Sequence, residues 1–144
     1  MPGELNIGLL LYLPYRFLEN RVFTALAQAG YGDVTPAQAR IFQRIGPAGT
    51  RLTELAEAAQ VTKQTAGFLV DQLENAGYVE RTPDPTDARA RLVRITTRGA
   101  ATIPISQAAI AAIEQEWANH LGEQRMAQLR EALTRLREIT DPYL

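Results

Sequence analysis

Residues 52–98 read LTELAEAAQVTKQTAGFLVDQLENAGYVERTPDPTDARARLVRITTR, and this stretch decides the fold. It contains a short helical pattern, a turn, a longer helical pattern and two strand-like runs joined by a charged tip. The first helical pattern has apolar residues at helical spacing, with Thr53 placed to cap it and Glu54 just inside its first turn. This order of elements predicts a winged helix-turn-helix.

The longer helical pattern has clear ends and one apolar stripe. Gln60 and Val61 form the turn before it, and Thr62 is placed to accept its free backbone N–H groups. Gly77 can adopt the left-handed conformation that ends a helix. The buried stripe that the spacing predicts consists of Ala66, Leu69, Val70 and Leu73. The opposite face is therefore exposed, and we expect Phe68 on its flank.

The N-terminal residues of this exposed face have the types that read base edges in a major groove. Gln64 can give adenine a bidentate contact, and Thr65 can offer its methyl group to thymine. Lys63 can reach a phosphate or a guanine. The alternative is that these side chains are only solvated, as most exposed polar residues are. We predict that Thr62, Lys63, Gln64 and Thr65 contact DNA.

Two runs rich in β-branched or aromatic residues, 78–82 and 92–96, predict the strands of a hairpin. Between them, residues 83–87 read PDPTD, a sequence rich in turn formers. This hairpin is the predicted wing. Its second half is basic, because Arg89, Arg91, Arg94 and Arg98 supply four positive charges.

An arginine at the tip of a hairpin beside a recognition helix suits the narrow, electronegative minor groove of DNA. We therefore predict DNA contacts for Arg89 and Arg91. The alternative for Arg89 is a surface ion pair with Asp87, which can also brace the wing for a DNA contact.

Three parts of the central stretch, LTELAEAAQVTKQT, LVDQLENAGYVER and DPTDARARLVRITTRG, together resemble the MarR family of bacterial regulators. The most specific features are D-x-R at Asp87 and Arg89 and T-x-x-G at Thr96 and Gly99, which have the spacing of the family. Outside the central half the similarity is in helix pattern and length.

The resemblance implies a homodimer with one winged helix per subunit. It implies that the residues matching Thr62, Gln64 and Thr65 enter the major groove, and that the one matching Arg89 enters the minor groove. The family often has a basic or polar side chain at the position of Phe68, so this departure shifts more of the expected affinity to the wing.

Both ends of the chain have helical patterns that are more apolar than a small winged part needs to cover itself. The pattern of residues 7–29 is interrupted by Pro14, which predicts a kink or a delayed start. Residues 97–121 form a long pattern, in which Pro104 predicts a bend or a later start. After Gly122 a last helix has a packing seam formed by Met126, Leu129, Leu133 and Leu136.

The predicted fold is mostly α with a small β-hairpin wing: a winged helix-turn-helix plus a helical dimerisation region built from both chain ends. The 144 residues fit one domain. Within it, residues 35–98 are the expected DNA-binding part, and residues 5–30 and 99–144 are the expected dimerisation part.

Composition narrows the possible functions. The formal net charge is −1 and the pI about 5.9, so DNA binding requires local positive charge, which the wing supplies. The absence of cysteine excludes a disulfide framework and a thiol redox switch. The beginning MPGELNIG lacks an early basic residue, and the apolar run of residues 7–13 is too short to span a bilayer, so we expect a cytoplasmic protein.

The sequence contains no arrangement typical of an enzyme. His120 is the only histidine and is expected at the surface of a helix end, so no metal site or cofactor is predicted. No nucleophile with a base and no glycine-rich phosphate loop is found.

Aromatic residues near the first helix have two interpretations. One is packing. The other follows from the resemblance, because many such regulators bind a small aromatic acid between the dimer helices and the winged part. The candidate cleft consists of Tyr12, Tyr15, Arg16 and Phe42, with Arg16 as the partner of the carboxylate.

Taken together, these features predict a dimeric, sequence-specific DNA-binding transcriptional regulator. We expect it to repress a nearby promoter through a pseudo-palindromic operator in double-stranded DNA and to be released by a small aromatic effector. The alternative is a winged-helix module that binds a partner protein and not DNA.

Overall fold

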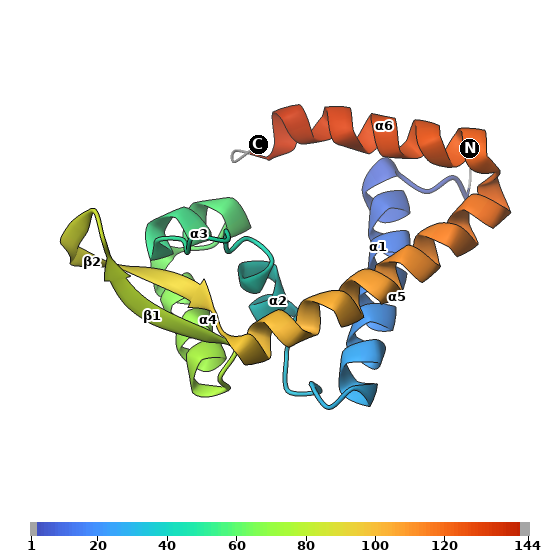
Figure 1. Ribbon diagram of the computed structural model, residues 1–144. Coiled ribbons are helices and arrows are strands. Elements are labelled where there is room, and N and C mark those ends of the chain that lie inside the picture. The colour runs from blue at the N-terminus through green and yellow to red at the C-terminus, as the bar shows by residue number, and fades with distance from the viewer. Residues whose placement is uncertain (1–2, 142–144) are drawn as a thin grey trace.

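The computed structural model describes residues 3–141 and forms an elongated, mostly helical molecule with one antiparallel hairpin (Figure 1). The winged helix-turn-helix lies at one end, and helices from both ends of the chain form the other. In chain order the elements are α1 (Ile7–Gln28), α2 (Pro36–Phe42), α3 (Leu52–Ala59), α4 (Lys63–Asn75), β1 (Val79–Asp84), β2 (Asp87–Ile95), α5 (Thr97–Leu121) and α6 (Glu123–Thr140). The predicted fold class is confirmed.

Local capping defines the helices of the winged part. Thr62 accepts a hydrogen bond from the backbone N–H of Thr65 at 3.1 Å, as predicted for the start of α4. The preceding turn contains Gln60 in the left-handed conformation, with a φ of 57°. The prediction that Thr53 caps α3 is wrong, because α3 begins at Leu52 and the extended residue before it is Arg51. Thr53 therefore lies inside the first turn.

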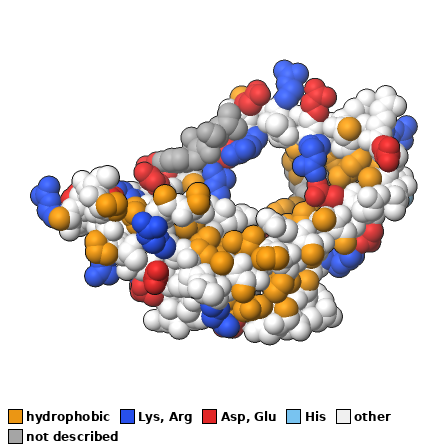
Figure 2. Space-filling model, viewed as in Figure 1, with side chains coloured by type: hydrophobic (Ala, Val, Ile, Leu, Met, Phe, Trp, Pro, Cys, Tyr) orange, Lys and Arg blue, Asp and Glu red, His pale blue; other side chains and the backbone are white. Residues whose placement is uncertain are grey.

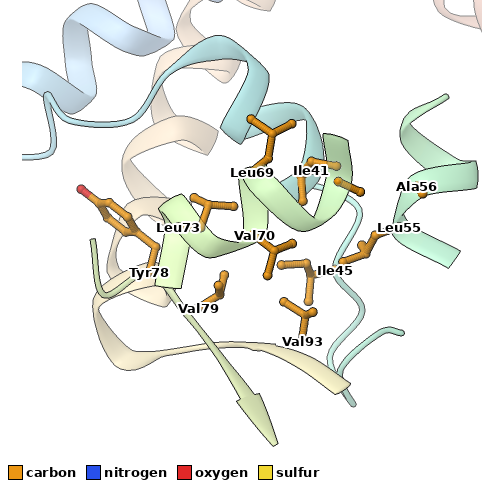
Figure 3. Close-up of a cluster of buried hydrophobic side chains, with 11 residues drawn as sticks. Ile41, Ile45, Leu55, Ala56, Leu69, Val70, Leu73, Tyr78, Val79 and Val93 are labelled. Carbon is orange, nitrogen blue, oxygen red and sulfur yellow. The ribbon is translucent and has the colours of Figure 1, made fainter. Parts of the chain in front are cut away.

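The core of the winged part is a single apolar cluster between α2, α3, α4 and the hairpin (Figure 3). The predicted stripe of α4 is buried in it: Ala66, Leu69, Val70 and Leu73. Ile41 and Leu55 complete it from α2 and α3, and Val79 and Val93 close it from the two strands. This packing presents the opposite face of α4 to solvent.

The strands of the wing are longer than predicted. β1 continues through Pro83 to Asp84, and β2 begins at Asp87, so only Pro85 and Thr86 form the tip. Proline is tolerated here because β1 is an edge strand of a two-stranded sheet. Thr50 adds a bridge on the other edge through two backbone hydrogen bonds with Val93 of 2.8 and 3.0 Å.

A small polar junction connects the recognition helix, the hairpin and α5. The hydroxyl of Thr96 accepts from the N–H of Gly99 at 3.1 Å and donates to the carbonyl of Gly77 at 2.6 Å. The N–H of Thr96 also donates to the carbonyl of Tyr78 at 3.1 Å. Gly99 packs so closely on that carbonyl that no side chain fits there. The T-x-x-G motif therefore ties the end of α4 to the start of α5.

The helices from the chain ends extend away from this junction. α1 packs along α5, where Arg21 pairs with Glu116 at 2.7 Å, and Arg130 of α6 pairs with Glu114 of α5. Pro14 and Pro104 lie inside continuous helices, so the alternative of a later helix start is wrong at both. Within residues 3–141, no helix has the length and apolar character needed to cross a membrane.

These end helices have apolar surface that the chain does not cover. Large hydrophobic side chains are exposed on α1 and α6, among them Leu9, Leu10, Leu129, Leu133 and Leu136. Figure 2 shows hydrophobic side chains over the end helices and a gap through the molecule between α6 and the other helices. The three leucines of the predicted α6 seam are thus exposed in a single chain, whereas Met126 is half-buried.

Replacing Gly99 with alanine tests the junction. We expect Gly99→Ala to lower the free energy of unfolding by about 1–3 kcal/mol, because the new methyl group collides with the backbone carbonyl of Tyr78. Urea denaturation measures this change. Gly32→Ala is the matched control, since its methyl group meets Ala27 at an ordinary 3.5 Å. Equal stability of the two variants would contradict the described junction.

Candidate nucleic-acid interface

The N-terminal turn of α4 has the four residues that sequence analysis assigned to the major groove. Thr62, Lys63, Gln64 and Thr65 are all exposed and adjacent. The hydroxyl of Thr62 lies 3.0 Å from that of Thr65 while it caps the helix, so both threonines have fixed positions. The structure brings these side chains together at the positive end of the helix dipole.

Phe68 is on the same face of α4. Ala66 and Val70, two residues before and two residues after Phe68, are fully buried. Two residues of an α-helix correspond to a rotation of about 200°, so Phe68 points away from both of them. The Phe68 residue is 61% exposed. It therefore lies near the centre of the exposed face, and the prediction that placed it on the flank is wrong.

Acidic groups further along α4 are paired with the wing. The Arg81 guanidinium on β1 contacts Asp71 and Glu74 at 2.8 Å each, and its backbone N–H donates to Glu74 at 3.1 Å. The single charge of Arg81 is shared between these two carboxylates and offsets part of their negative charge. These contacts also fix the angle between the recognition helix and the first strand of the wing.

A second ion pair supports the tip of the wing. Asp84, whose side chain is 6% exposed, accepts from Arg51 Nε at 2.8 Å and lies 2.7 Å from the second guanidinium nitrogen. The N–H and hydroxyl of Thr86 donate to the other carboxylate oxygen at 2.8 and 2.7 Å. Hydrogen bonds from Thr86 and then from Arg51 lower the pKa of Asp84 to about 2.

Sequence analysis missed this support. An aspartate two residues before a threonine at a hairpin tip is a local signal for a side-chain turn, and it was available at Asp84 and Thr86. Arg51 had no such signal, because it is 33 residues away along the chain.

The four arginines of the wing region have different roles. Arg94 donates to the hydroxyl of Thr82 at 2.9 Å, and Arg98 donates to the carbonyl of Ala76 at 3.1 Å, so both are used within the fold. Arg89 and Arg91 are exposed. Arg91 is opposite Pro83 in the ladder, and Arg89 lies in the irregular stretch of β2 between Asp87 and Arg91, at the outer end of the wing.

The Asp87 carboxylate contacts the backbone of Arg89 more closely than it contacts the Arg89 guanidinium. The carboxylate accepts from the N–H of Arg89 at 3.0 Å, whereas Arg89 Nε is 3.9 Å away. The Arg89 side chain is 96% exposed, and such an ion pair contributes little. This geometry leaves the arginine extended into solvent at the outer end of the wing.

A cavity of about 390 Å³ lies where the end helices meet the winged part. Tyr15 and Phe42 line it, but Tyr12 and Arg16 are not among its lining residues. The Arg16 guanidinium instead lies 5.7 Å from the centre of the Tyr12 ring. The structure thus brings together only two of the four residues proposed for an effector.

The positively charged group of this cavity is Arg40, and Glu19, which also lines it, is an acidic one. The Arg40 guanidinium lies 3.4 Å from Glu19, which also accepts a hydrogen bond from the Tyr15 hydroxyl at 2.9 Å. A hydrogen bond with Tyr15 raises the pKa of Arg40, so this side chain stays charged and forms an ion pair with Glu19. Sequence analysis missed Arg40 because α2 had been interpreted only by its apolar face.

Tyr78 lines the winged side of the same cavity. Its hydroxyl donates to Asp33 and accepts from Arg98 at 3.0 Å, and burial raises its pKa to about 12. Tyr78 therefore connects the cavity wall to the Thr96 junction.

Comparison with known proteins places this geometry in a family. A sequence model of the MarR family matches residues 32–90. The transcriptional regulator HosA of Escherichia coli O111:H- is 34% identical over 108 residues, which are 71% of this chain and 77% of HosA. The chain belongs to the MarR family. It is a winged-helix, DNA-binding transcriptional regulator and not an enzyme.

Solved structures of MarR extend the similarity to the whole fold. The apo form of MarR from E. coli is 26% identical with a TM-score of 0.71, and the match covers 93% of this chain and 98% of MarR. A structure of the Multiple Antibiotic Resistance Repressor, MarR, is 26% identical with a TM-score of 0.70, covering 94% and 97%. MarR family regulators bind DNA and act as dimers.

The ion pair at the wing tip predicts a pH-dependent contribution to stability. The pKa of Asp84 is about 2 in the folded chain against an ordinary value of 3.8, so its charge stabilises the fold above about pH 4. This contribution is lost as pH falls towards 2. We therefore expect Asp84→Asn to lower the thermal unfolding midpoint at pH 7 by a few degrees and to differ less from the parent at pH 2.

Thermal unfolding followed by circular dichroism between pH 2 and 7 measures this difference. Glu80→Gln is the control, because Glu80 is an exposed carboxylate in the same hairpin. A difference between Asp84→Asn and the parent that stays constant over this range would contradict the role of the charge.

Proposed function

We propose that this MarR family protein is a dimeric repressor that binds a pseudo-palindromic operator and is released by a small aromatic acid. The observation that carries the proposal is the exposed N-terminal turn of α4 beside a hairpin whose outermost side chain is an extended arginine. A helix in the major groove and an arginine in the adjacent minor groove are compatible with this arrangement.

The proposed major-groove contacts are made by Thr62, Lys63, Gln64 and Thr65, and the proposed minor-groove contacts by Arg89 and Arg91. Local charge supports this assignment despite the net charge of −1. Arg81 offsets part of the negative charge of Asp71 and Glu74, and Lys63 with the exposed wing arginines supplies positive charge at this face.

Dimerisation through the end helices sets the spacing of the operator. The exposed leucines of α1 and α6 and the gap beside α6 suit a second copy of the chain (Figure 2). Two recognition helices related by a two-fold axis require half-sites about 10 bp apart. The Multiple Antibiotic Resistance Repressor, MarR, is similar over nearly the whole chain, and this similarity supports repression, and not activation, of the target promoter.

The cavity supports the proposed effector. Its apolar walls, which include Phe42, suit an aromatic ring, and Arg40 can bind a carboxylate in exchange for its 3.4 Å contact with Glu19. Because Arg40 and not Arg16 lines the cavity, Arg40 is the proposed partner of the carboxylate. An effector that prefers a dimer with wrongly spaced recognition helices weakens operator binding by a coupling energy of about 1–3 kcal/mol.

Selection of bound sequences from a random duplex pool at physiological salt tests DNA recognition. We expect a pseudo-palindrome with half-sites about 10 bp apart. Gln64→Ala should relax the preference at one base pair per half-site and cost about 1–3 kcal/mol of binding. Arg89→Ala should weaken binding to operators with A·T-rich flanks.

Titration of the selected duplex by fluorescence anisotropy measures these losses. Unchanged affinity in both variants would show that another surface binds DNA. A folded dimer that enriches no sequence, and that binds duplexes without a steep salt dependence, would favour the alternative of a protein-binding winged helix.

Addition of salicylate tests the effector cavity. We expect salicylate to raise the thermal midpoint of the protein and to weaken operator binding by about 5- to 150-fold. Arg40→Gln should abolish both effects, whereas Arg16→Gln should retain them, because Arg16 lies outside the cavity lining. Loss of the effects in Arg16→Gln alone, or no effect of salicylate on the parent, would contradict this assignment.

A further inference from the structure

An exposed phenylalanine lies at the centre of the surface proposed to enter the major groove. Phe68 is 61% exposed, although it belongs to a helix whose other large apolar side chains, Leu69, Val70 and Leu73, are buried. Lys63, Gln64 and Asp71 on the same side of α4 are polar. The ring is thus the main apolar group on this face.

The position of Phe68 relative to Gln64 defines what the ring can reach. The two residues are four apart, so they are neighbours on one face and about 6 Å apart along the helix axis. This distance corresponds to about two base-pair steps. Side chains of a helix lean towards its N-terminus, so the ring is directed towards the side of Gln64.

The chemistry of the major groove offers one apolar partner for such a ring. A phenyl group cannot pair with a phosphate or form a hydrogen bond with a base edge. The C5 methyl group of thymine is the apolar group exposed on the floor of the major groove, and phenylalanine is among the side chains that contact it. Burial of the ring against this methyl group removes apolar surface of both from water.

The surroundings of Phe68 allow close approach to the groove. Asp71, three residues further along, repels phosphates less than a free carboxylate would, because the Arg81 guanidinium lies 2.8 Å from it. Gly67 beside Phe68 faces Leu52 of α3 at an ordinary packing distance, so the neighbouring position adds no bulk to the exposed face.

We infer that Phe68 is a specificity-determining residue that recognises the C5 methyl group of a thymine within about two base pairs of the pair contacted by Gln64. The inference rests on the proposed function, because it requires α4 in the major groove. The inferred contact adds an apolar interaction to the recognition of the half-site by the polar side chains of α4.

Replacement of thymine by deoxyuridine tests this inference, since it removes only the methyl group. In the duplex selected above, each thymine of the half-site is replaced in turn, symmetrically in both halves. We expect one position at which the parent protein loses about 4-fold in affinity per methyl group, or about 15-fold for the symmetric pair. A second sensitive position is expected only where the Thr65 methyl group contacts a thymine, and Thr65→Ser identifies that position; the remaining positions should change little.

Variants of the protein assign the effect to a side chain. Phe68→Ala should bind the thymine and deoxyuridine duplexes equally, and Phe68→Leu should retain part of the preference. Thr65→Ser is the matched control, because it removes the other methyl group proposed to face thymine while keeping the hydroxyl that lies against Thr62. Thr65→Ser should retain the preference at the Phe68 position.

Three results of the binding measurements would overturn the inference while leaving the proposed function intact. They are equal binding of every deoxyuridine duplex by the parent, an undiminished preference in Phe68→Ala, and loss of the preference in Thr65→Ser alone. In each of these cases DNA recognition itself is intact, so the proposed function survives. Absence of any selected duplex would instead refute the proposed function together with this inference.

A control measurement tests whether Phe68→Ala is folded and dimeric. Its circular dichroism spectrum and its sedimentation should match those of the parent. Dissociation of its dimer would assign the ring to a protein contact and would also overturn the inference.

Discussion

The hydroxyl group of Thr96 is the point on which the arrangement of this protein depends. One oxygen atom caps α5 by accepting from Gly99 and fastens the end of the recognition helix by donating to the carbonyl of Gly77. The absence of a side chain at Gly99 lets α5 start directly against the backbone of Tyr78. The α4 helix, the wing and α5 therefore meet at one junction, and a change in the angle of one alters the position of the others.

Two arginine clamps extend this rigidity to the proposed DNA surface. Arg81 joins α4 to the first strand, and Arg51 joins the start of α3 to the wing tip through Asp84. Both clamps use bidentate or multiple contacts with carboxylates, which fix direction as well as distance. Tyr78 belongs to both the cavity wall and the junction, so the proposed effector would act on elements that this junction connects.

Sequence pattern predicted those features that depend on local chemistry. The stripe of Leu69 and Val70 follows from helical period, and the cap at Thr62 follows from its place before the stripe. Contacts between distant residues had no such signal, so Arg51 and Asp84 were missed, and Pro83 was assigned to the turn although an edge strand accepts it.

The face of α1 was also beyond prediction, because apolar residues surround its first half, from Leu9 to Leu13, without a single stripe. This ambiguity explains why the sequence pattern predicts Arg16, and not Arg40, as a residue of the cavity.

The α5 helix runs without interruption from the wing to the far end of the molecule (Figure 1). A residue inserted in its middle would turn the following apolar face by about 100° relative to the wing. The length of α5 therefore fixes the direction in which the far end of the molecule presents its apolar surface.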